Sequence, residues 1–264
     1  MRLRHRRCRV MRMDAEEIIA RYDREIRQQP QEGPGAIVEH EPGVVRVLSA
    51  DDDWTGITWT DLTGLDPAAV IAAQVRRFAG AGLPWEWKLY SHDRPADLPA
   101  RLLAAGFEPG PPEALLVAEV AALPQVPELP PGVHLVPVTS PHEAELLVRV
   151  HDEVFGGDHS AIGRAVLARP DTVRAVVAMA GDRPICAGRI EFHPGTAFAS
   201  IWGGGTSEDW RGRGVFRAVV AHRAAQAAAA GYPYLQVDAS DDSRPILKRL
   251  GFVELATTTP FVHA

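Results

Sequence analysis

Residues 202–216 read Trp202-Gly203-Gly204-Gly205-Thr206-Ser207-Glu208-Asp209-Trp210-Arg211-Gly212-Arg213-Gly214-Val215-Phe216. An apolar segment that predicts a strand precedes this stretch, and an alanine-rich segment that predicts a helix follows it. Backbone N–H groups gather at the start of a helix. Gly212 and Gly214 allow the chain to turn sharply and approach a ligand closely, because neither has a Cβ. Positive charge beside them comes from Arg211, Arg213 and Arg217. The stretch therefore predicts an anion-binding loop suited to a phosphate or diphosphate.

The glycine spacing does not match two common phosphate loops. A dinucleotide fingerprint needs Gly-x-Gly-x-x-Gly, and a nucleotide P-loop ends in Gly-Lys-Ser/Thr. The order of strand, Arg-Gly-x-Gly loop, long helix, strand, short helix and Leu-Gly-Phe instead resembles the GCN5-related N-acetyltransferases (GNAT). The later elements are matched by Tyr234–Asp238 and Ile246–Phe252, and the resemblance covers roughly Pro131 to Ala264. It implies an α/β (α+β) fold with a mixed, mostly antiparallel sheet flanked by helices.

The resemblance also implies a site for acetyl-CoA as co-substrate. Backbone groups of the loop and first helical turn would take the diphosphate, and those of the preceding strand would take the pantetheine arm. Phe216 stands where the family has a small residue. Three consecutive glycines weaken a strand, and a bulge or a close ligand approach would explain them. The implied CoA-binding residues are Gly204, Gly205, Thr206, Arg211, Gly212, Arg213, Gly214, Val215 and Phe216.

Acetyl transfer to an amine needs geometry, an oxyanion donor and a route for the amine proton. A backbone N–H near Gly203 or Gly204 could polarise the thioester carbonyl. Glu191 is our first candidate base, although a solvated strand face explains its position equally well. Asp238 is a second candidate, and it could equally cap the following turn. Many GNAT members have a tyrosine that acts as the general acid at the position where this chain has Leu247. Ser240 or an ordered water would therefore have to protonate the leaving thiolate.

Acceptor contacts are predicted between the first two helices of the second half. Glu153, Phe155 and Asp158 lie there, and the carboxylates suit a cationic amine. An ordinary solvated helix end is the alternative. His151 and His159 in the same segment are eight residues apart across two glycines, which matches no standard ligand spacing. We therefore expect no metal site.

The chain is predicted to contain two tandem halves. Residues 1–13 form a basic, disordered tail, 14–120 a degenerate GNAT-like domain, 121–132 a proline-rich linker and 133–264 the catalytic GNAT domain. The motif around Arg94-Pro95 and Gly106-Phe107 echoes the one around Arg244-Pro245 and Gly251-Phe252. The first half then looks like a shortened copy, although the echo could be chance. Because it has no Arg-Gly-x-Gly loop, we expect it to support the second half or to cover part of its cleft.

Local patterns predict an alternation of strands and helices along both halves. Helices are expected at 14–29, 66–79, 96–105, 141–154, 161–168, 213–230 and 244–250. Strands are expected at 36–40, 44–48, 57–60, 85–90, 115–120, 133–138, 173–179, 184–193, 197–202, 234–238 and from 252 onward.

Composition excludes several classes of protein. No apolar run approaches the roughly 18 to 20 residues of a membrane helix. The formal net charge is −6 although six arginines occupy the first twelve residues, so the remaining body is acidic, which argues against nucleic-acid binding as the main activity. With two distant cysteines, a reducing cytoplasm is expected. The predicted function is transfer of an acetyl group to a primary amine in a ternary complex, by a monomer or homodimer; a non-catalytic acyl-CoA sensor or scaffold is the alternative.

Overall fold

The computed structural model describes residues 14–263 except 32, 34, 50–53 and 80–83. The predicted tail at 1–13 lies outside the described residues. The helices are α1 (Ala15–Tyr22), η1 (Asp23–Arg27), α2 (Pro67–Phe78), α3 (Leu98–Ala104), η2 (Val120–Ala122), α4 (Pro141–Phe155), α5 (Ser160–Ala168), η3 (Glu208–Trp210), α6 (Val215–Ala229) and α7 (Arg244–Leu250). The strands are β1 (Ile37–Glu41), β2 (Val44–Leu48), β3 (Gly56–Thr60), β4 (Trp85–Tyr90), β5 (Glu108–Pro109), β6 (Glu113–Glu119), β7 (Val133–Pro137), β8 (Val173–Ala180), β9 (Arg183–Phe192), β10 (Phe198–Thr206), β11 (Tyr234–Ala239) and β12 (Val253–His263).

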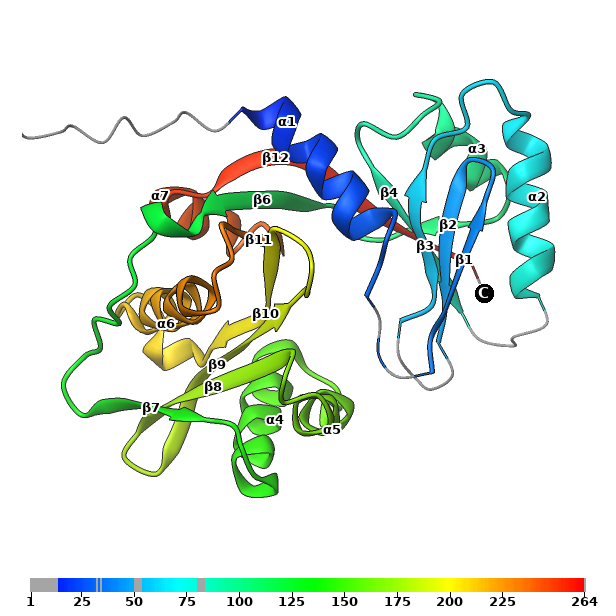
Figure 1. Ribbon diagram of the computed structural model, residues 1–264. Helices are drawn as coiled ribbons and strands as arrows, with labels where there is room; N and C mark the ends of the chain where they lie inside the picture. Colours follow the sequence, from blue (N-terminus) through cyan, green and yellow to red (C-terminus); the bar gives the residue numbers. More distant parts are fainter. Residues whose placement is uncertain (1–13, 32, 34, 50–53, 80–83, 264) are drawn as a thin grey trace, which may run out of the picture.

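One continuous sheet joins both halves of the chain (Figure 1). Its strand order is β1-β2-β3-β4-β12-β6-β11-β10-β9-β8-β7, with β5 paired to β12. The pairs β3–β4 and β10–β11 are parallel, and the other pairs are antiparallel. The expected mixed, mostly antiparallel sheet flanked by helices is confirmed.

The two halves exchange a strand. β6 comes from the first half, but both of its neighbours, β11 and β12, come from the second. β12 ends the second half, but it pairs only with β4, β5 and β6 of the first. Around Thr258 its partner changes from β6 to β4, so one long strand spans the junction. The pairing therefore crosses the expected division at 121–132.

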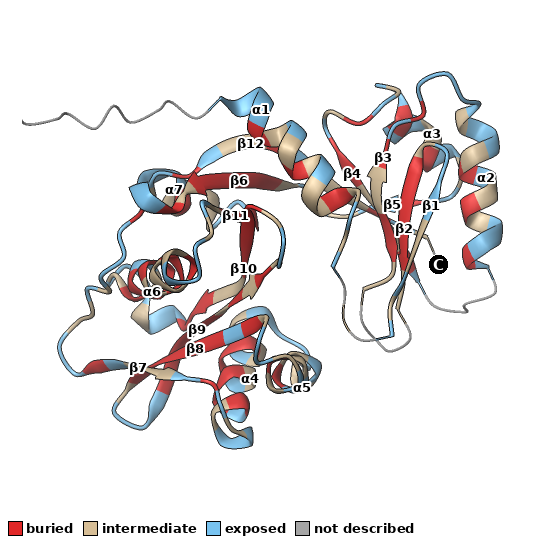
Figure 2. Ribbon diagram, viewed as in Figure 1, coloured by how far each residue is buried: buried red, intermediate tan, exposed pale blue. Residues whose placement is uncertain are grey.

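Helices cover both faces of the sheet at β6, which is buried along most of its length (Figure 2). Leu116 and Ala118 pack with buried residues of α6 and α7, whereas Leu115 and Val117 pack with Ile18 and Tyr22 of α1. Helices α4 and α5 pack on β8 and β9 through a separate cluster, and α2 and α3 pack on β4 through another. Because successive side chains of a strand point to opposite faces, α6 and α1 cover opposite sides of β6.

Local signals explain the element ends. Asp14 and Asp66 accept backbone hydrogen bonds at the starts of α1 and α2, as expected of N-caps. Gly251 follows α7 in the left-handed conformation. One expectation is wrong: β10 does not end at Trp202 but continues through the three glycines to Thr206. It continues because β9 still pairs with it there, a long-range contact that local sequence does not contain.

Candidate functional site

The predicted anion loop has the backbone geometry its glycines suggested. Gly212 has φ +74° and Gly214 has φ +85°, and Gly214 directly precedes α6. These left-handed conformations turn the chain from η3 into the helix at little steric cost only because both residues are glycine. The loop therefore delivers the first turn of α6 to the surface beside the end of β10.

A row of backbone donors on this loop has no acceptor among the described residues. The N–H of Arg211 bonds to Glu208 O and that of Ala218 to Gly214 O, but the N–H groups of residues 212–217 between them have no partner. None of Arg211, Arg213 and Arg217 forms an ion pair within the described part of the chain. Unpaired donors and uncompensated positive charge at a helix N-terminus favour an anion.

The corresponding helix start in the first half is closed. The side chain of Asp66 accepts from the N–H groups of Ala68 and Ala69, at 3.0 and 3.4 Å. The Asp66 carboxylate thus occupies the N-terminus of α2, the position where a phosphate would bind, and its negative charge would repel that phosphate. This geometry agrees with the expectation that only the second half offers an anion loop.

Strand β10 opens a gap in the sheet next to the loop. It pairs with β11 only from Phe198 to Ser200, and its remaining residues have no β11 partner. Its register with β9 shifts between Trp202 and Gly205, so Gly203 and Gly204 form a bulge. A bulge leaves backbone groups outside the ladder, and the missing β11 contacts leave room for a chain to pass between the strands.

Two buried side chains hold the bulge. His151 of α4 is wholly buried, and its Nε2 lies 2.9 Å from Gly203 O. Burial lowers the pKa of His151 to about 4, so the ring is neutral at pH 7 and donates to that carbonyl. Arg223 of α6 donates to the carbonyls of Trp202 and Arg189, both at 3.3 Å. Burial lowers its pKa to about 10, and it has no carboxylate partner among the described residues.

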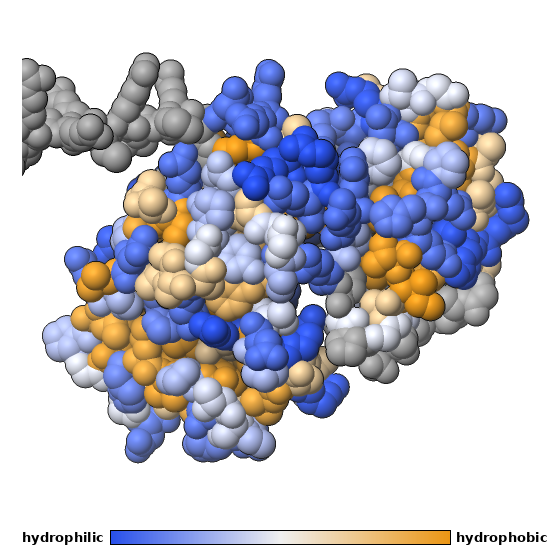
Figure 3. All heavy atoms as spheres, viewed as in Figure 1, coloured by the Kyte–Doolittle hydropathy of each residue, from blue (hydrophilic) through white to orange (hydrophobic). Residues whose placement is uncertain are grey.

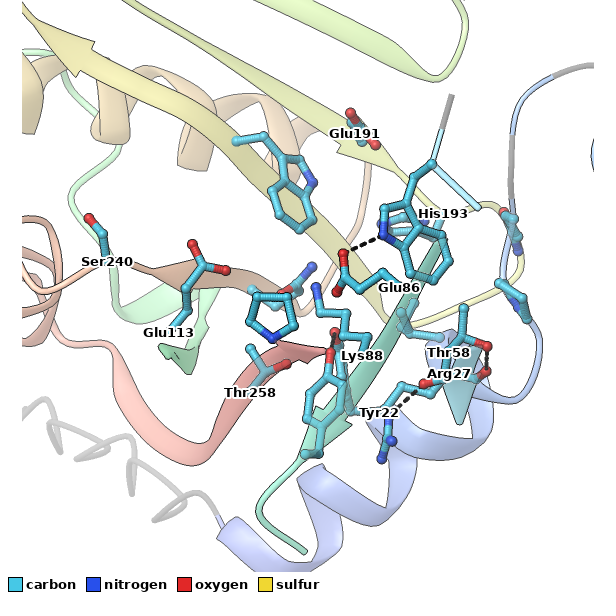
Figure 4. A pocket seen from close by; sticks show the side chains of 18 of the residues that line it. Tyr22, Arg27, Thr58, Glu86, Lys88, Glu113, Glu191, His193, Ser240 and Thr258 are labelled. Atoms are coloured by element: carbon cyan, nitrogen blue, oxygen red, sulfur yellow. Dashed lines mark hydrogen bonds between the residues drawn. The ribbon is translucent and has the colours of Figure 1, made fainter. Parts of the chain in front are cut away.

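A pocket of about 900 Å³ lies on the face of the sheet opposite α6, at the junction of the halves (Figure 4). Both halves line it: α1, η1, β3, β4 and β6 from the first, and β9, β10, β11, β12 and the loop after β11 from the second. The space-filling view shows the surface hollowed between the two lobes (Figure 3). Trp202, next to the bulge, lies in its wall.

The strand registers explain why these side chains meet. Across the sheet, Tyr90 pairs with Thr258, Thr258 with Glu113, and Gln236 with Ser200, which in turn pairs with Glu191. Paired residues share a face of the sheet. The pocket floor is therefore one face of the exchanged sheet, and it exists because β6 and β12 connect the halves.

Four of the charged side chains that line the pocket form ion pairs: Arg27, Lys88, Arg189 and Glu191. Lys88 lies 2.5 Å from Asp238, whose side chain is completely buried. Burial lowers the pKa of Lys88, but the Asp238 carboxylate outweighs this effect and the net pKa is raised. Arg189 pairs with Glu191 at 2.7 Å. Burial, followed by the nearby Asp238 charge, raises the pKa of Glu113.

The structure brings some predicted site residues together and separates others. Glu191 and Ser240 line the pocket, and Asp238 lies directly behind it through Lys88. Leu247 is fully buried in the core on the α6 side. The three predicted acceptor residues do not line the pocket. Glu153 pairs with Arg183 at 3.4 Å, Asp158 accepts a hydrogen bond from the backbone N–H of Ser160, and the half-exposed Phe155 lies beside Gly205.

Sequence reasoning missed the first-half side chains in the pocket. Glu86, Lys88 and Tyr90 alternate along β4 with Trp85, Trp87 and Leu89, which face the first-half core. Polar residues at every second position of an otherwise aromatic strand were the available signal. In the described part of the chain, no group of three His, Cys, Asp or Glu side chains is placed to hold a metal ion, and no helix is long and apolar enough to cross a membrane.

Comparison with solved structures identifies the fold. A GCN5-related N-acetyltransferase from Kribbella flavida is 21% identical over 96% of this chain and 96% of that chain, with a TM-score of 0.67. A GCN5-related N-acetyltransferase from Sphaerobacter thermophilus is 12% identical, covering 94% and 84%, with a TM-score of 0.60. A tandem GNAT protein from the clavulanic acid biosynthesis pathway is 13% identical, covering 88% and 84%, with a TM-score of 0.59. No family model and no curated protein matches the sequence.

Proposed function

From the GNAT fold that both halves of this chain build together, we propose that the protein is an N-acetyltransferase. It transfers an acetyl group from acetyl-CoA to a primary amine by direct attack within a ternary complex. The observation that carries this proposal is the run of unpaired N–H groups at residues 212–217, beside a bulged strand and a pocket on the far face of the sheet. A diphosphate fits the first feature, and an acceptor fits the last.

The gap between β10 and β11 supports the path of the pantetheine arm. In this proposal Gly204, Gly205 and Thr206 flank the arm, and the diphosphate binds over Arg211–Phe216. Gly204 lies close to Phe216, because a Cβ on Gly204 would lie 2.8 Å from the Phe216 ring. Only glycine therefore lets the Phe216 ring pack directly against the strand at this point.

The chemistry proceeds by addition and elimination. The amine lone pair forms the new N–C bond at the thioester carbonyl, and a backbone N–H of the bulge near Gly203 or Gly204 stabilises the oxyanion. Collapse breaks the C–S bond, and the amine proton passes to a base. Glu191 is the proposed base and Ser240 the proposed relay to the thiolate, because both line the pocket. Both carboxylates are ion-paired, but the Asp238 side chain is completely buried whereas the Glu191 side chain is 21% exposed. We therefore propose that Asp238 supports the site and that Glu191 accepts the proton.

Thiol release with a panel of amines tests the proposal. Acetyl-CoA and the intact protein should give amine-dependent thiol release, and the Gly214→Asp variant should lose it. Binding of CoA without turnover of any amine would instead identify the sensor that the absent tyrosine at Leu247 suggests. Activity that survives deletion of residues 1–12 would show that the basic tail takes no part.

A further inference from the structure

Buried polar atoms without hydrogen-bond partners in the described part of the chain lie in the floor of the pocket and directly behind it. Gln236 Oε1 and Asp238 Oδ1 of β11 and Thr258 Oγ1 of β12 are buried with no partner among the described residues. Gln236 is 2% exposed and Thr258 1% exposed, and both line the pocket. A buried polar group without a partner costs about 1–3 kcal/mol, so such a set indicates that a ligand supplies the donors.

Glu113 lies beside these acceptors. It begins β6, pairs directly with Thr258 across to β12, and lines the pocket (Figure 4). Asp238 pairs with Leu115, two residues further along the same face of β6, so Glu113 and Asp238 are diagonal neighbours at about 7–8 Å. Glu113 has no hydrogen bond or ion pair within the described part of the chain. A half-buried carboxylate therefore joins the three unsatisfied acceptors.

The remaining charges of the pocket do not compensate Glu113. Lys88 is bound to Asp238, Arg189 to Glu191, and Arg27 to Asp93. Glu86 accepts a hydrogen bond from the indole N–H of Trp54, which is neutral, so the negative charge of Glu86 is not compensated by this contact. Asp241 and Asp242 add two more carboxylates at the loop after β11. Among the lining cations, Arg169 alone has no carboxylate partner within the described part of the chain. The pocket thus has an excess of negative charge around Glu113.

We infer that the acceptor is a diamine: it has a second ammonium group, which Glu113, Gln236 and Thr258 hold while the first amine reacts. This inference rests on the proposed function. An ammonium has three donors and no acceptor, and it can donate to the Glu113 carboxylate, the Gln236 carbonyl oxygen and a lone pair of the Thr258 hydroxyl. β11 lies between β6 and β10, so Glu113 and the bulge are at least two strand spacings apart, about 10 Å, and further where β10 separates from β11. This span suits an aliphatic diamine whose second ammonium meets the Glu113 side chain.

The first half gains a role in this arrangement. It provides Glu113 through the exchanged strand β6, and it positions Thr258 by pairing with β12. The half that lacks an anion loop therefore determines which acceptor binds, and Glu113 is a specificity-determining residue.

Three amines of equal chain length test the inference. Cadaverine has two ammonium groups, pentylamine has one, and aminovalerate replaces the second with a carboxylate. We expect kcat/KM to fall in that order, with cadaverine roughly tenfold or more above pentylamine, as for a hydrogen bond to a charged group. Glu113→Gln should remove the difference mainly through KM. Glu119→Gln, on the same face of the same strand but outside the pocket, is the matched control and should keep it.

Binding separates this inference from the proposed function. Calorimetry with CoA shows whether each variant is folded and retains its nucleotide site. If CoA binds but no amine is turned over, direct titration with cadaverine still decides: binding that Glu113→Gln abolishes supports the second-ammonium site. Equal kcat/KM for cadaverine and pentylamine, or cadaverine binding unchanged in Glu113→Gln, overturns the inference. Absence of CoA binding by the native protein would overturn the proposed function instead.

Discussion

Replacement of Gly203 by alanine tests whether the bulge is as closely packed as the structure shows. Gly203 has φ +57°, and a Cβ there would lie 2.7 Å from His151 Cε1 and 2.9 Å from Nε2. The left-handed conformation costs a non-glycine residue about 1–2 kcal/mol, and overpacking adds about 1–3 kcal/mol. We therefore expect Gly203→Ala to lower the free energy of unfolding by about 2–5 kcal/mol.

Gly195, in the turn between β9 and β10, provides the control. It has φ +80° but nothing within 4 Å of an added Cβ, so Gly195→Ala should cost only the conformational part, about 1–2 kcal/mol. Denaturant unfolding measures both variants. Since the bulge is separate from the loop at residues 212–217, Gly203→Ala should reduce acetyl transfer far more than CoA affinity.

A second variant identifies the clash itself. In the Gly203→Ala/His151→Ala double variant the steric conflict is absent, so its two changes should cost less than the sum of the single ones. The reasoning is refuted if Gly203→Ala is as stable as Gly195→Ala and as active as the native protein, because His151 would then not fix the bulge.

Three further changes probe the loop, the bulge and the pocket. Gly214→Asp introduces a carboxylate and a Cβ at φ +85°, and it should weaken CoA binding at least about tenfold by calorimetry, whereas Gly231→Asp at the far end of α6 should not. Burial lowers the pKa of His151 from 6.5 to about 4, so between these pH values the unfolded chain binds more protons than the folded protein. When the pH falls from 7 to 4, the free energy of unfolding should therefore decrease by about 3 kcal/mol more in the native protein than in His151→Phe. Lys88→Met leaves the completely buried Asp238 side chain without its counter-ion and should destabilise the fold by about 3–5 kcal/mol in denaturant, with partial recovery in Lys88→Met/Asp238→Asn; an unchanged midpoint would contradict the pairing.

Local chemistry made the second half predictable. The glycines at 212 and 214, the alanine-rich helix and the Leu-Gly-Phe after α7 are short-range signals, because each acts through the backbone of its own neighbours. The alternation along β9 placed Glu191 and its neighbour Arg189 on one face, and both line the pocket. The role of these residues in catalysis stays a prediction.

Long-range pairing was not predictable from one sequence. Nothing in residues 113–119 specifies that β11 and β12 will be the neighbours of β6, because hydrogen bonds between strands are the same for any sequence. Without the exchange, Glu113 and Lys88 belong to a separate domain, so the sequence directed attention to Glu153 and Asp158 of the second half, whose role as acceptor contacts stays a prediction.

We propose that the free backbone donors at residues 212–217 bind the diphosphate of coenzyme A. Calorimetry with CoA and with pantetheine, which lacks the diphosphate and the nucleotide, tests it most directly. We expect saturable binding of CoA and binding of pantetheine that is weaker by at least about hundredfold, because several charge-assisted hydrogen bonds are lost. No heat with CoA, or equal affinity for the two, would contradict it.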